Sequence, residues 1–165
     1  MESIVKTITI RPILEKDNPV IATIIRLVLT EFNAAKCGTV YYDPTTDDLY
    51  HLFQKEKSVY FIAEEDSKVL GGCGIYPTDG LPDGCCELVK LYLLPEARKA
   101  GLGKRLIEES VAAAKEFGYT KMYLESLPEL TKAVSLYEKL GFTYLSAALG
   151  DSKHFGCSLW MIKEL

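Results

Sequence analysis

The chain has 165 residues, of which 48% are hydrophobic and 25% are charged, and its formal net charge is −4. This length predicts one domain, residues 1–165, that can bury a core without disulfides or a metal, and the composition argues against disorder. The acidic balance gives no electrostatic reason to bind nucleic acid, and no apolar stretch reaches the roughly 20 residues that a membrane span requires.

The first half of the chain predicts three strands and two helices. Alternating residues predict a strand over residues 5–10, and apolar residues at helical spacing predict an amphipathic helix over residues 19–35. A shorter helix is expected over residues 47–55. Residues 59–63 and 69–76 are expected to pair as a hairpin. Three glycines weaken its second strand, or mark a bulge or a close backbone approach: Gly71, Gly72 and Gly74.

The second half predicts strands that alternate with helices. A strand over residues 85–94 ends at Pro95, and a helix over residues 103–117 is followed by Gly118, a residue type typical of helix ends. The remaining elements are a strand, a helix and two strands, over residues 121–124, 129–140, 142–145 and 159–162. This order predicts an α/β fold with a mostly antiparallel first half and a β-α-β-α-β second half.

The cysteines favour a reducing compartment. They are odd in number and show no C-x-x-C spacing, and the chain has only two histidines to complete a zinc site. The start of the chain carries charges and no apolar leader segment. We therefore expect a cytoplasmic protein without a metal. The five cysteines are Cys37, Cys73, Cys85, Cys86 and Cys157, and we expect most of them to be buried free thiols.

The most informative segment lies between the strand that ends near residue 94 and the helix that follows. Arg98, Gly101 and Gly103 form an R-x-x-G-x-G pattern, with lysines at positions 99 and 104. Helix N-termini present free amides and the positive end of the dipole, and glycines let the backbone approach phosphate oxygens. The pattern matches neither the P-loop nor the dinucleotide fingerprint. It indicates an anion cradle, or alternatively a glycine loop that only caps the helix.

This segment and a second one resemble the GNAT superfamily of acetyl-CoA-dependent N-acyltransferases. The pattern at residues 98–103 is similar to that family's pyrophosphate signature, [QR]-x-x-G-x-[GA]. Downstream, Leu-Tyr-Glu-Lys-Leu-Gly-Phe at residues 136–142 resembles the family's L-Y-x-x-x-G-F. The resemblance is strong over residues 87–144 and loose over residues 5–76, where only the order of elements agrees.

The resemblance implies a fold and a cofactor site. The fold is α/β (α+β), with a mixed, mostly antiparallel sheet of six to seven strands, about four flanking helices and a splayed strand pair. Acetyl-CoA lies in the splay, where strand backbone pairs with its pantetheine and signature amides hold its pyrophosphate. The residues implied for the cofactor are Leu91, Tyr92, Leu93, Arg98, Lys99, Ala100, Gly101, Leu102, Gly103 and Lys104.

Two residues are implied as catalytic. Glu87 lies in the cofactor strand, 11 positions before Arg98, where many relatives carry a glutamate that accepts a proton from the amine. The alternative for Glu87 is an exposed edge-strand carboxylate. Tyr137 matches the family's general acid, which protonates the departing thiolate; its alternative is a core tyrosine whose hydroxyl is satisfied. Partial burial is expected to raise the pKa of Glu87 toward a useful range.

Some positions depart from the family or stay open. Many relatives carry Asn where this chain has Leu130, so Ser126 or backbone is expected to replace that contact with the cofactor.

His154 lies in the loop between the last two strands, and in this family that loop often borders the acceptor pocket. The alternative for His154 is a solvated loop histidine. Tyr41-Tyr42-Asp43 faces the acceptor by the same analogy, or packs under a loop. An acyl-cysteine route through Cys85 or Cys86 is disfavoured because no histidine lies nearby in the sequence.

The resemblance implies an N-acetyltransferase that moves an acetyl group from acetyl-CoA to a primary amine in a ternary complex. The acceptor is a small-molecule or protein amine, such as a polyamine, an aminoglycoside-like amine, a lysine or an N-terminus. The alternatives are transfer of a longer acyl group and a CoA-binding regulatory module without turnover. A homodimer is also consistent with the family, and nothing in the sequence identifies the acceptor.

Overall fold

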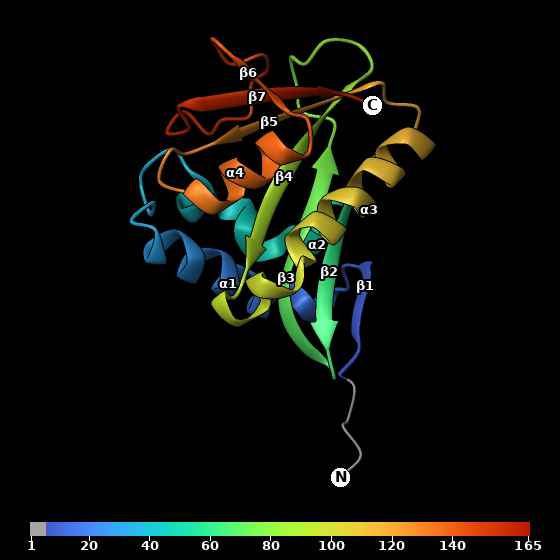
Figure 1. Cartoon of the computed structure of the whole chain (residues 1–165), viewed down its shortest axis with the longest axis vertical. Helices are drawn as coiled ribbons and strands as arrows, with labels where there is room; N and C mark the ends of the chain where they lie inside the picture. Colours follow the sequence, from blue (N-terminus) through green and yellow to red (C-terminus); the bar gives the residue numbers. More distant parts are fainter. Residues whose placement is uncertain (1–5) are drawn as a thin grey trace.

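The protein is described by a computed structural model covering residues 6–165, in which helices pack on both faces of one sheet (Figure 1). The sheet has seven strands in the order β1-β2-β3-β4-β5-β7-β6. The strands are β1 Ile8–Pro12, β2 Val59–Glu65, β3 Lys68–Tyr76, β4 Cys85–Leu93, β5 Lys121–Ser126, β6 Thr143–Leu145 and β7 Leu159–Glu164. The α-helices are α1 Asn18–Glu31, α2 Leu49–Leu52, α3 Leu102–Glu116 and α4 Thr131–Lys139.

The predicted fold class is confirmed, and several boundaries differ. The strand expected at residues 5–10 runs from Ile8 to Pro12 because its ladder with β2 sets its ends; residue 5 lies outside the described residues. Helix α1 ends at Glu31, four residues early, because Asn33 adopts φ +56° and the Ala34 amide bonds back to the Leu29 carbonyl.

Two other helices are shorter than predicted. The helix expected over residues 47–55 is a 3₁₀ turn, Pro44–Asp48, followed by the single α-turn of α2. The Asp48 carboxylate accepts a hydrogen bond from the His51 amide and so starts a new helical turn there. Helix α4 begins at Thr131 because the Leu130 amide bonds to the Leu127 carbonyl in a preceding turn.

The sheet separates two apolar clusters. Alternate residues of β2 point to opposite faces: Tyr60 and Ile62 belong to the cluster under α1, whereas Val59 and Phe61 pack with the cluster under α3 and α4. Figure 1 shows α3 and α4 on the viewer's side of the strands, with α1 and α2 beyond them. Both faces of the central strands are thus buried, which fixes their register.

The glycines of β3 mark a close approach of backbones, one of the predicted alternatives. A Cβ added at Gly71 would lie 2.1 Å from the Tyr92 carbonyl oxygen, and one at Gly74 would lie 2.4 Å from the Val59 carbonyl oxygen. Between β3 and β4 the register shifts: Gly74 pairs with Val89, but Gly72 pairs with Tyr92. Strand β4 therefore carries one extra residue, a β-bulge, between these pairs.

Strands β4 and β5 form the sheet's parallel pair, and they separate after three residues. The ladder joins Cys85 to Lys121 and ends where Glu87 meets Tyr123. Beyond it, β4 continues beside β3 and β5 continues beside β7, so a wedge opens between them as predicted. Across residues 6–165, no helix has the length and apolar character needed to cross a membrane.

Candidate active site

The N-terminus of α3 presents free amides. Gly101, just before the helix, adopts the left-handed conformation with φ +68°, and the Arg105 amide bonds to its carbonyl at 3.1 Å. The three amides ahead of Arg105 in the helix, those of Leu102, Gly103 and Lys104, precede the first i→i−4 bond and have no intrahelical acceptor. These amides lie at the positive end of a helix dipole, which is the arrangement that an anion cradle requires.

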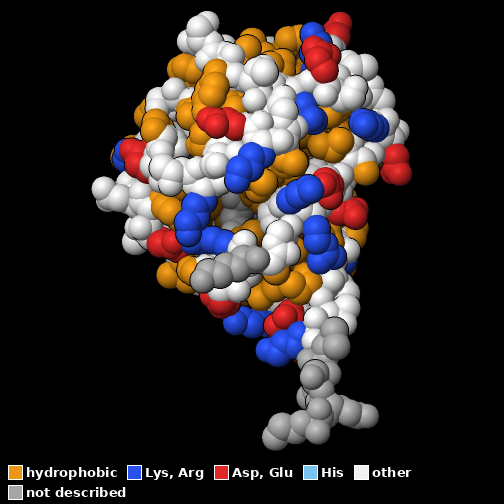
Figure 2. Space-filling view, viewed as in Figure 1, with side chains coloured by type: hydrophobic (Ala, Val, Ile, Leu, Met, Phe, Trp, Pro, Cys, Tyr) orange, Lys and Arg blue, Asp and Glu red, His pale blue; other side chains and the backbone are white. Residues whose placement is uncertain are grey.

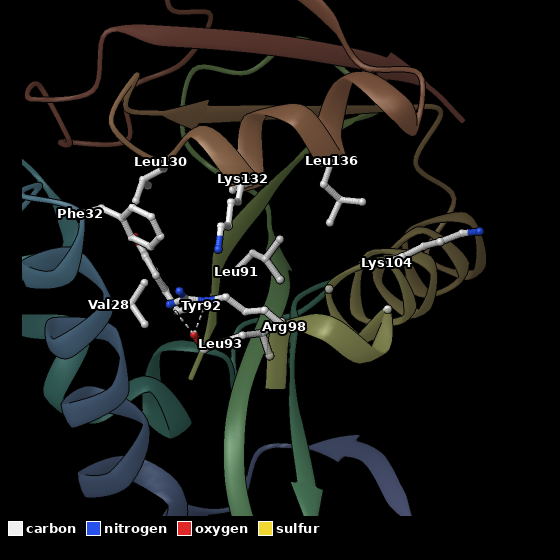
Figure 3. A pocket seen from close by; sticks show the side chains of 13 residues that line it. Val28, Phe32, Leu91, Tyr92, Leu93, Arg98, Lys104, Leu130, Lys132 and Leu136 are labelled. Atoms are coloured by element: carbon white, nitrogen blue, oxygen red, sulfur yellow. Dashed lines mark hydrogen bonds between the residues drawn. The ribbon is translucent and has the colours of Figure 1, made fainter. Parts of the chain in front are cut away.

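A cavity of about 260 Å³, which we call the helix groove, runs from these amides along the end of β4 (Figure 3). A Cβ on Gly103 would lie 3.1 Å from the Leu136 Cδ2 atom, so glycine lets α3 approach α4 closely there. The groove is lined by Val28, Phe32, Leu91, Tyr92, Leu93, Arg98, Gly101, Gly103, Lys104, Leu130, Lys132, Ala133 and Leu136.

Basic side chains gather on this face around a hollow, although the protein as a whole is acidic (Figure 2). Figure 3 shows the Lys132 amine pointing from α4 into the helix groove, whereas Lys104 extends away from it. The Lys104 ammonium lies 3.8 Å from the Glu108 carboxylate, one turn along α3. Lys132 was not among the residues expected to contact the cofactor, because a charged residue on an amphipathic helix usually marks its solvated face.

Arg98 uses its side chain to join elements of the groove. Its guanidinium donates two hydrogen bonds to Glu31 of α1, at 2.6 and 3.0 Å, and two to the Leu93 carbonyl. It also lies 5.0 Å from the centre of the Phe32 ring. The Arg98 guanidinium in turn holds the pKa of the Glu31 carboxyl below its usual value. Arg98 therefore fixes the turn before α3 against the end of α1.

The residues predicted for the cofactor lie in different places. Leu91 to Leu93, Arg98, Gly101, Gly103 and Lys104 line the helix groove. Leu102 is fully buried in the core, so only its backbone can reach the groove, and Ala100 is exposed outside it. The side chain of Lys99 lies outside the described part of the chain.

A second, smaller cavity of about 50 Å³ occupies the wedge between β4 and β5, and we call it the splay cavity. It shares Leu91, Tyr92 and Leu130 with the helix groove. Both predicted catalytic residues, Glu87 and Tyr137, line it. Ser126, the residue suggested as a replacement for the family's Asn, also lines it, whereas Leu130 closes the side toward the groove.

Glu87 is a buried acid. Its exposed fraction is 4%, and its Oε1 atom accepts a hydrogen bond from the Thr78 hydroxyl at 2.6 Å. Burial raises the pKa of the Glu87 carboxyl to about 7, opposed by the Thr78 bond and by Lys90 and reinforced by Glu125. Glu87 is not an exposed edge-strand carboxylate, since its side chain is buried and β4 lies in the middle of the sheet.

Tyr137 is also buried, with 7% exposed, and its ring meets that of Phe142 edge-on at 5.8 Å. Burial raises the pKa of Tyr137 well above its usual value, so its hydroxyl keeps its proton. Among the side chains that the structure describes, none forms a hydrogen bond with that hydroxyl. The buried ring agrees with a core position, and the assignment of Tyr137 as general acid stays a prediction.

A third cavity, of about 510 Å³, opens on the other side of Glu87, and we call it the loop pocket. Its walls come from three loops and from β4, and it shares Glu87, Lys90 and His154 with the splay cavity. The three cavities thus follow one another from the N-terminus of α3, through the wedge, to the loops. The loop pocket is lined by residues 38, 39, 42–45, 52, 53, 76, 78, 79, 87, 89, 90 and 151–155.

Two loops of this pocket are joined by a hydrogen bond. The His154 Nε2 atom lies 2.7 Å from Asp43 Oδ2. This bond, with a lesser contribution from Thr45, holds the pKa of the Asp43 carboxyl well below its usual range. Each residue was expected near an acceptor site, but their pairing was not, because 111 positions separate them. His154 is thus not a free loop histidine.

The thiols near the wedge are protonated at neutral pH. Burial raises the pKa of Cys86 to about 12 and also raises that of Cys85. Cys157 lines the splay cavity, and burial raises its pKa to about 12 as well. Only a thiolate is an effective nucleophile, so the expectation of inert buried thiols agrees with these environments.

Comparison with known proteins gives a consistent result. The family described as Acetyltransferase (GNAT) family matches residues 22–142. A protein of Escherichia coli K12 named Uncharacterized N-acetyltransferase YjgM is 39% identical over 151 residues, which cover 91% of this chain and 90% of that protein. A GNAT-family acetyltransferase from Staphylococcus aureus shares the fold, with a TM-score of 0.85 at 16% identity over 96% of this chain and 99% of that one. So does PaiA N-acetyltransferase from Thermoplasma acidophilum, solved with coenzyme A, with a TM-score of 0.75 at 20% identity and the same coverage.

Proposed function

Since the chain belongs to the GNAT acetyltransferase family, we propose that it transfers an acetyl group from acetyl-CoA to a primary amine by direct attack in a ternary complex. The observation that carries this proposal is the succession of the helix groove, the splay cavity and the loop pocket, with Glu87 lining the last two. Two substrates can then enter from opposite sides and meet at β4.

The helix groove suits coenzyme A. The amides of Leu102, Gly103 and Lys104 and the amine of Lys132 would hold the diphosphate, and the apolar end of β4 would face the pantetheine. The coenzyme A-bound relative from Thermoplasma acidophilum supports this role for the shared fold. When bound, acetyl-CoA supplies an activated thioester.

Glu87 acts as the general base in this proposal. A primary amine with a pKa near 10.4 is almost fully protonated at neutral pH, and only the neutral amine is a nucleophile. Glu87 takes this proton, and its own pKa of about 7 keeps it ready to do so at physiological pH. Its place in the wall of both the loop pocket and the splay cavity lets it receive a proton from the acceptor side.

Tyr137 acts as the general acid. Its buried hydroxyl retains its proton and has no competing partner among the described side chains. Glu87 first takes one proton from the ammonium. As the nitrogen–carbon bond replaces the sulfur–carbon bond, Tyr137 gives its proton to the departing sulfur, and the second proton that the nitrogen loses on becoming an amide restores the Tyr137 hydroxyl. The two residues therefore divide the proton transfers between opposite sides of the splay cavity.

An amine screen tests the proposal. Purified protein is incubated with acetyl-CoA and a panel of polyamines, amino sugars, amino acids and lysine peptides, and free thiol is measured. We expect at least one amine to release CoA and to be recovered as its N-acetyl derivative. Calorimetry with CoA runs in parallel. CoA binding without thiol release from any amine would favour a regulatory CoA-binding module, and failure of both would end the assignment.

A further inference from the structure

Lys90 is a buried cation at the inner end of the loop pocket. Its exposed fraction is 9%, and it lines both the loop pocket and the splay cavity. An ammonium group that leaves water without a compensating partner costs several kcal/mol. Burial accordingly lowers the pKa of Lys90, in spite of the attraction of Asp43 and Glu87. Its place in the wall of two cavities makes Lys90 a candidate for a functional group.

The backbone of β4 is distorted so as to place this lysine. In a regular strand, residues three apart point to opposite faces, so Lys90 would face away from Glu87. The β-bulge between Val89 and Tyr92 removes this alternation, and Lys90 adopts φ +55°, an unfavourable conformation for a long side chain. The Tyr60 hydroxyl fixes it by donating to the Lys90 carbonyl at 2.8 Å. Lys90 and Glu87 consequently line the same pocket.

The acids around Lys90 are already engaged elsewhere. Asp43 accepts hydrogen bonds from His154 and Thr45, and Glu87 accepts one from Thr78. Glu125, on β5, accepts hydrogen bonds from Tyr123 and from Ser152. Among the described side chains, none forms a hydrogen bond or an ion pair with the Lys90 ammonium. The ammonium is thus open to an anion that enters through the loop pocket.

We propose that the acceptor is an amino acid: a small molecule whose amine meets Glu87 while its carboxylate pairs with Lys90. This inference rests on the proposed function, because it assigns the acceptor of that reaction. One cation and one base on the same wall would recognise the two ends of an amino acid and would orient the amine toward the wedge. The proton transfers are those already described.

The test compares each amino acid with its own carboxamide, which keeps the amine and loses the negative charge. The probes are glycine, alanine, serine, leucine, phenylalanine, glutamate and lysine with their carboxamides. Two measurements are made: kcat/KM with acetyl-CoA, and calorimetric binding to the CoA-saturated protein, which needs no turnover. We expect at least one amino acid to exceed its carboxamide roughly tenfold to a hundredfold in both, the range of a hydrogen bond to a charged group.

Lys90→Met removes the charge at similar side-chain length and should reduce that ratio to near one, whereas Lys90→Arg should keep most of it. Lys68→Met is the matched control, because Lys68 is exposed and pairs with Glu96 on another part of the surface. The Tm of Lys90→Met should not fall below that of the wild type, because the substitution removes a buried charge. If the Tm falls while the ratio of amino acid to carboxamide stays unchanged, Lys90 has a merely structural role and the proposal is overturned.

The remaining outcomes separate this inference from the proposed function. If carboxamides are acetylated as well as the amino acids, the inference fails and the proposed function stands. If amino acids bind in a Lys90-dependent manner but release no thiol, the ligand class stands and the proposed function fails. Binding of no probe, or an acetyl group found on Lys90 itself, overturns the inference.

Discussion

The helix groove and the loop pocket meet on β4, yet they are built in different ways. The recognition groups that we propose for the groove are chiefly backbone amides of one short segment, residues 102–104, placed by a glycine and a helix. The loop pocket takes its polar side chains from three loops and from Glu87 and Lys90 of β4. The loop residues are 39, 42, 43, 45, 78, 79 and 151–154, which lie far apart in the sequence. Its central contact, from Asp43 to His154, spans 111 positions.

This difference separates the part of the site that depends on backbone geometry from the part that depends on particular side chains. Amides bind phosphate whatever side chains surround them, so the groove needs only the glycines and a helix start. The loop pocket depends on which side chains three loops bring together, and any of them can change without altering the fold. Substitutions in one region should therefore leave the function of the other largely intact.

Gly101→Asp should have the largest effect and should fall on the groove alone. A carboxylate beside the bound diphosphate costs several kcal/mol, which corresponds to a loss of about a thousandfold in affinity for CoA. An added Cβ at Gly101 meets nothing within 4 Å, and an acidic residue at a helix N-terminus favours the helix, so the fold should persist. Calorimetry with CoA measures the effect.

Gly118→Asp is the control for this substitution. Gly118 also has a positive φ, +90°, and open space around its Cβ position, but it lies at the opposite end of α3. It carries the same backbone strain without the nearby diphosphate. Equal losses of CoA affinity in the two variants would mean that strain, and not the anion cradle, explains the result.

Glu87→Gln acts where the two regions meet and should lower kcat/KM about a hundredfold, within the range for loss of a general base. The wild-type kcat/KM should rise with pH up to about 7, because the base works only when deprotonated and its pKa is about 7. The variant should lose this rise. CoA affinity should persist, since Glu87 does not line the helix groove.

Glu116→Gln removes an exposed carboxylate at the end of α3 and serves as the matched control. Its pH profile should follow that of the wild type. A Glu87→Gln variant that keeps the rise toward pH 7 would exclude Glu87 as the base and would direct attention to His154, which also lines both inner cavities.

The same contrast explains which features the sequence predicted. The splayed strands and a cofactor site beside them were implied by the resemblance to the GNAT family, which rests on two short local motifs. Glu87 was expected to be partly buried in the strand of that site, and it is buried. Lys90 was missed because regular alternation places it away from Glu87, and only the bulge reverses this. The bond between Asp43 and His154 depends on the packing of two loops, and the inward turn of Lys132 depends on where α4 lies over the wedge.

Tyr137→Phe should lower kcat about tenfold, or 1.4 kcal/mol in activation free energy, because the departing thiolate loses its proton donor. Stability should be retained, since no described side chain bonds to this hydroxyl and the ring still packs on Phe142. Tyr144→Phe is the control on an exposed tyrosine. An unchanged kcat in Tyr137→Phe, with thiol release measured directly, would assign the protonation step to another group or to water.

Asp43→Asn should have the smallest effect and should fall on the loop pocket. Loss of a charged hydrogen bond to His154 should raise the acceptor KM roughly fivefold, or about 1 kcal/mol, without changing the acetyl-CoA KM.

The stability of Asp43→Asn supplies a second, pH-dependent test. The hydrogen bonds from His154 and Thr45 hold the pKa of Asp43 below its ordinary value of 3.8. The ionised carboxylate therefore contributes its full stabilisation above pH 3.8, and this contribution is lost as the pH falls toward the pKa of Asp43 in the folded protein. The wild type should therefore exceed the variant in Tm at pH 6, and the gap should narrow near pH 3. Asp47→Asn, in the same loop but paired with Arg26 outside the pocket, should leave the acceptor KM unchanged. An equal rise in the acetyl-CoA KM of Asp43→Asn would show that the groove and the pocket are coupled through β4, which contradicts their independence.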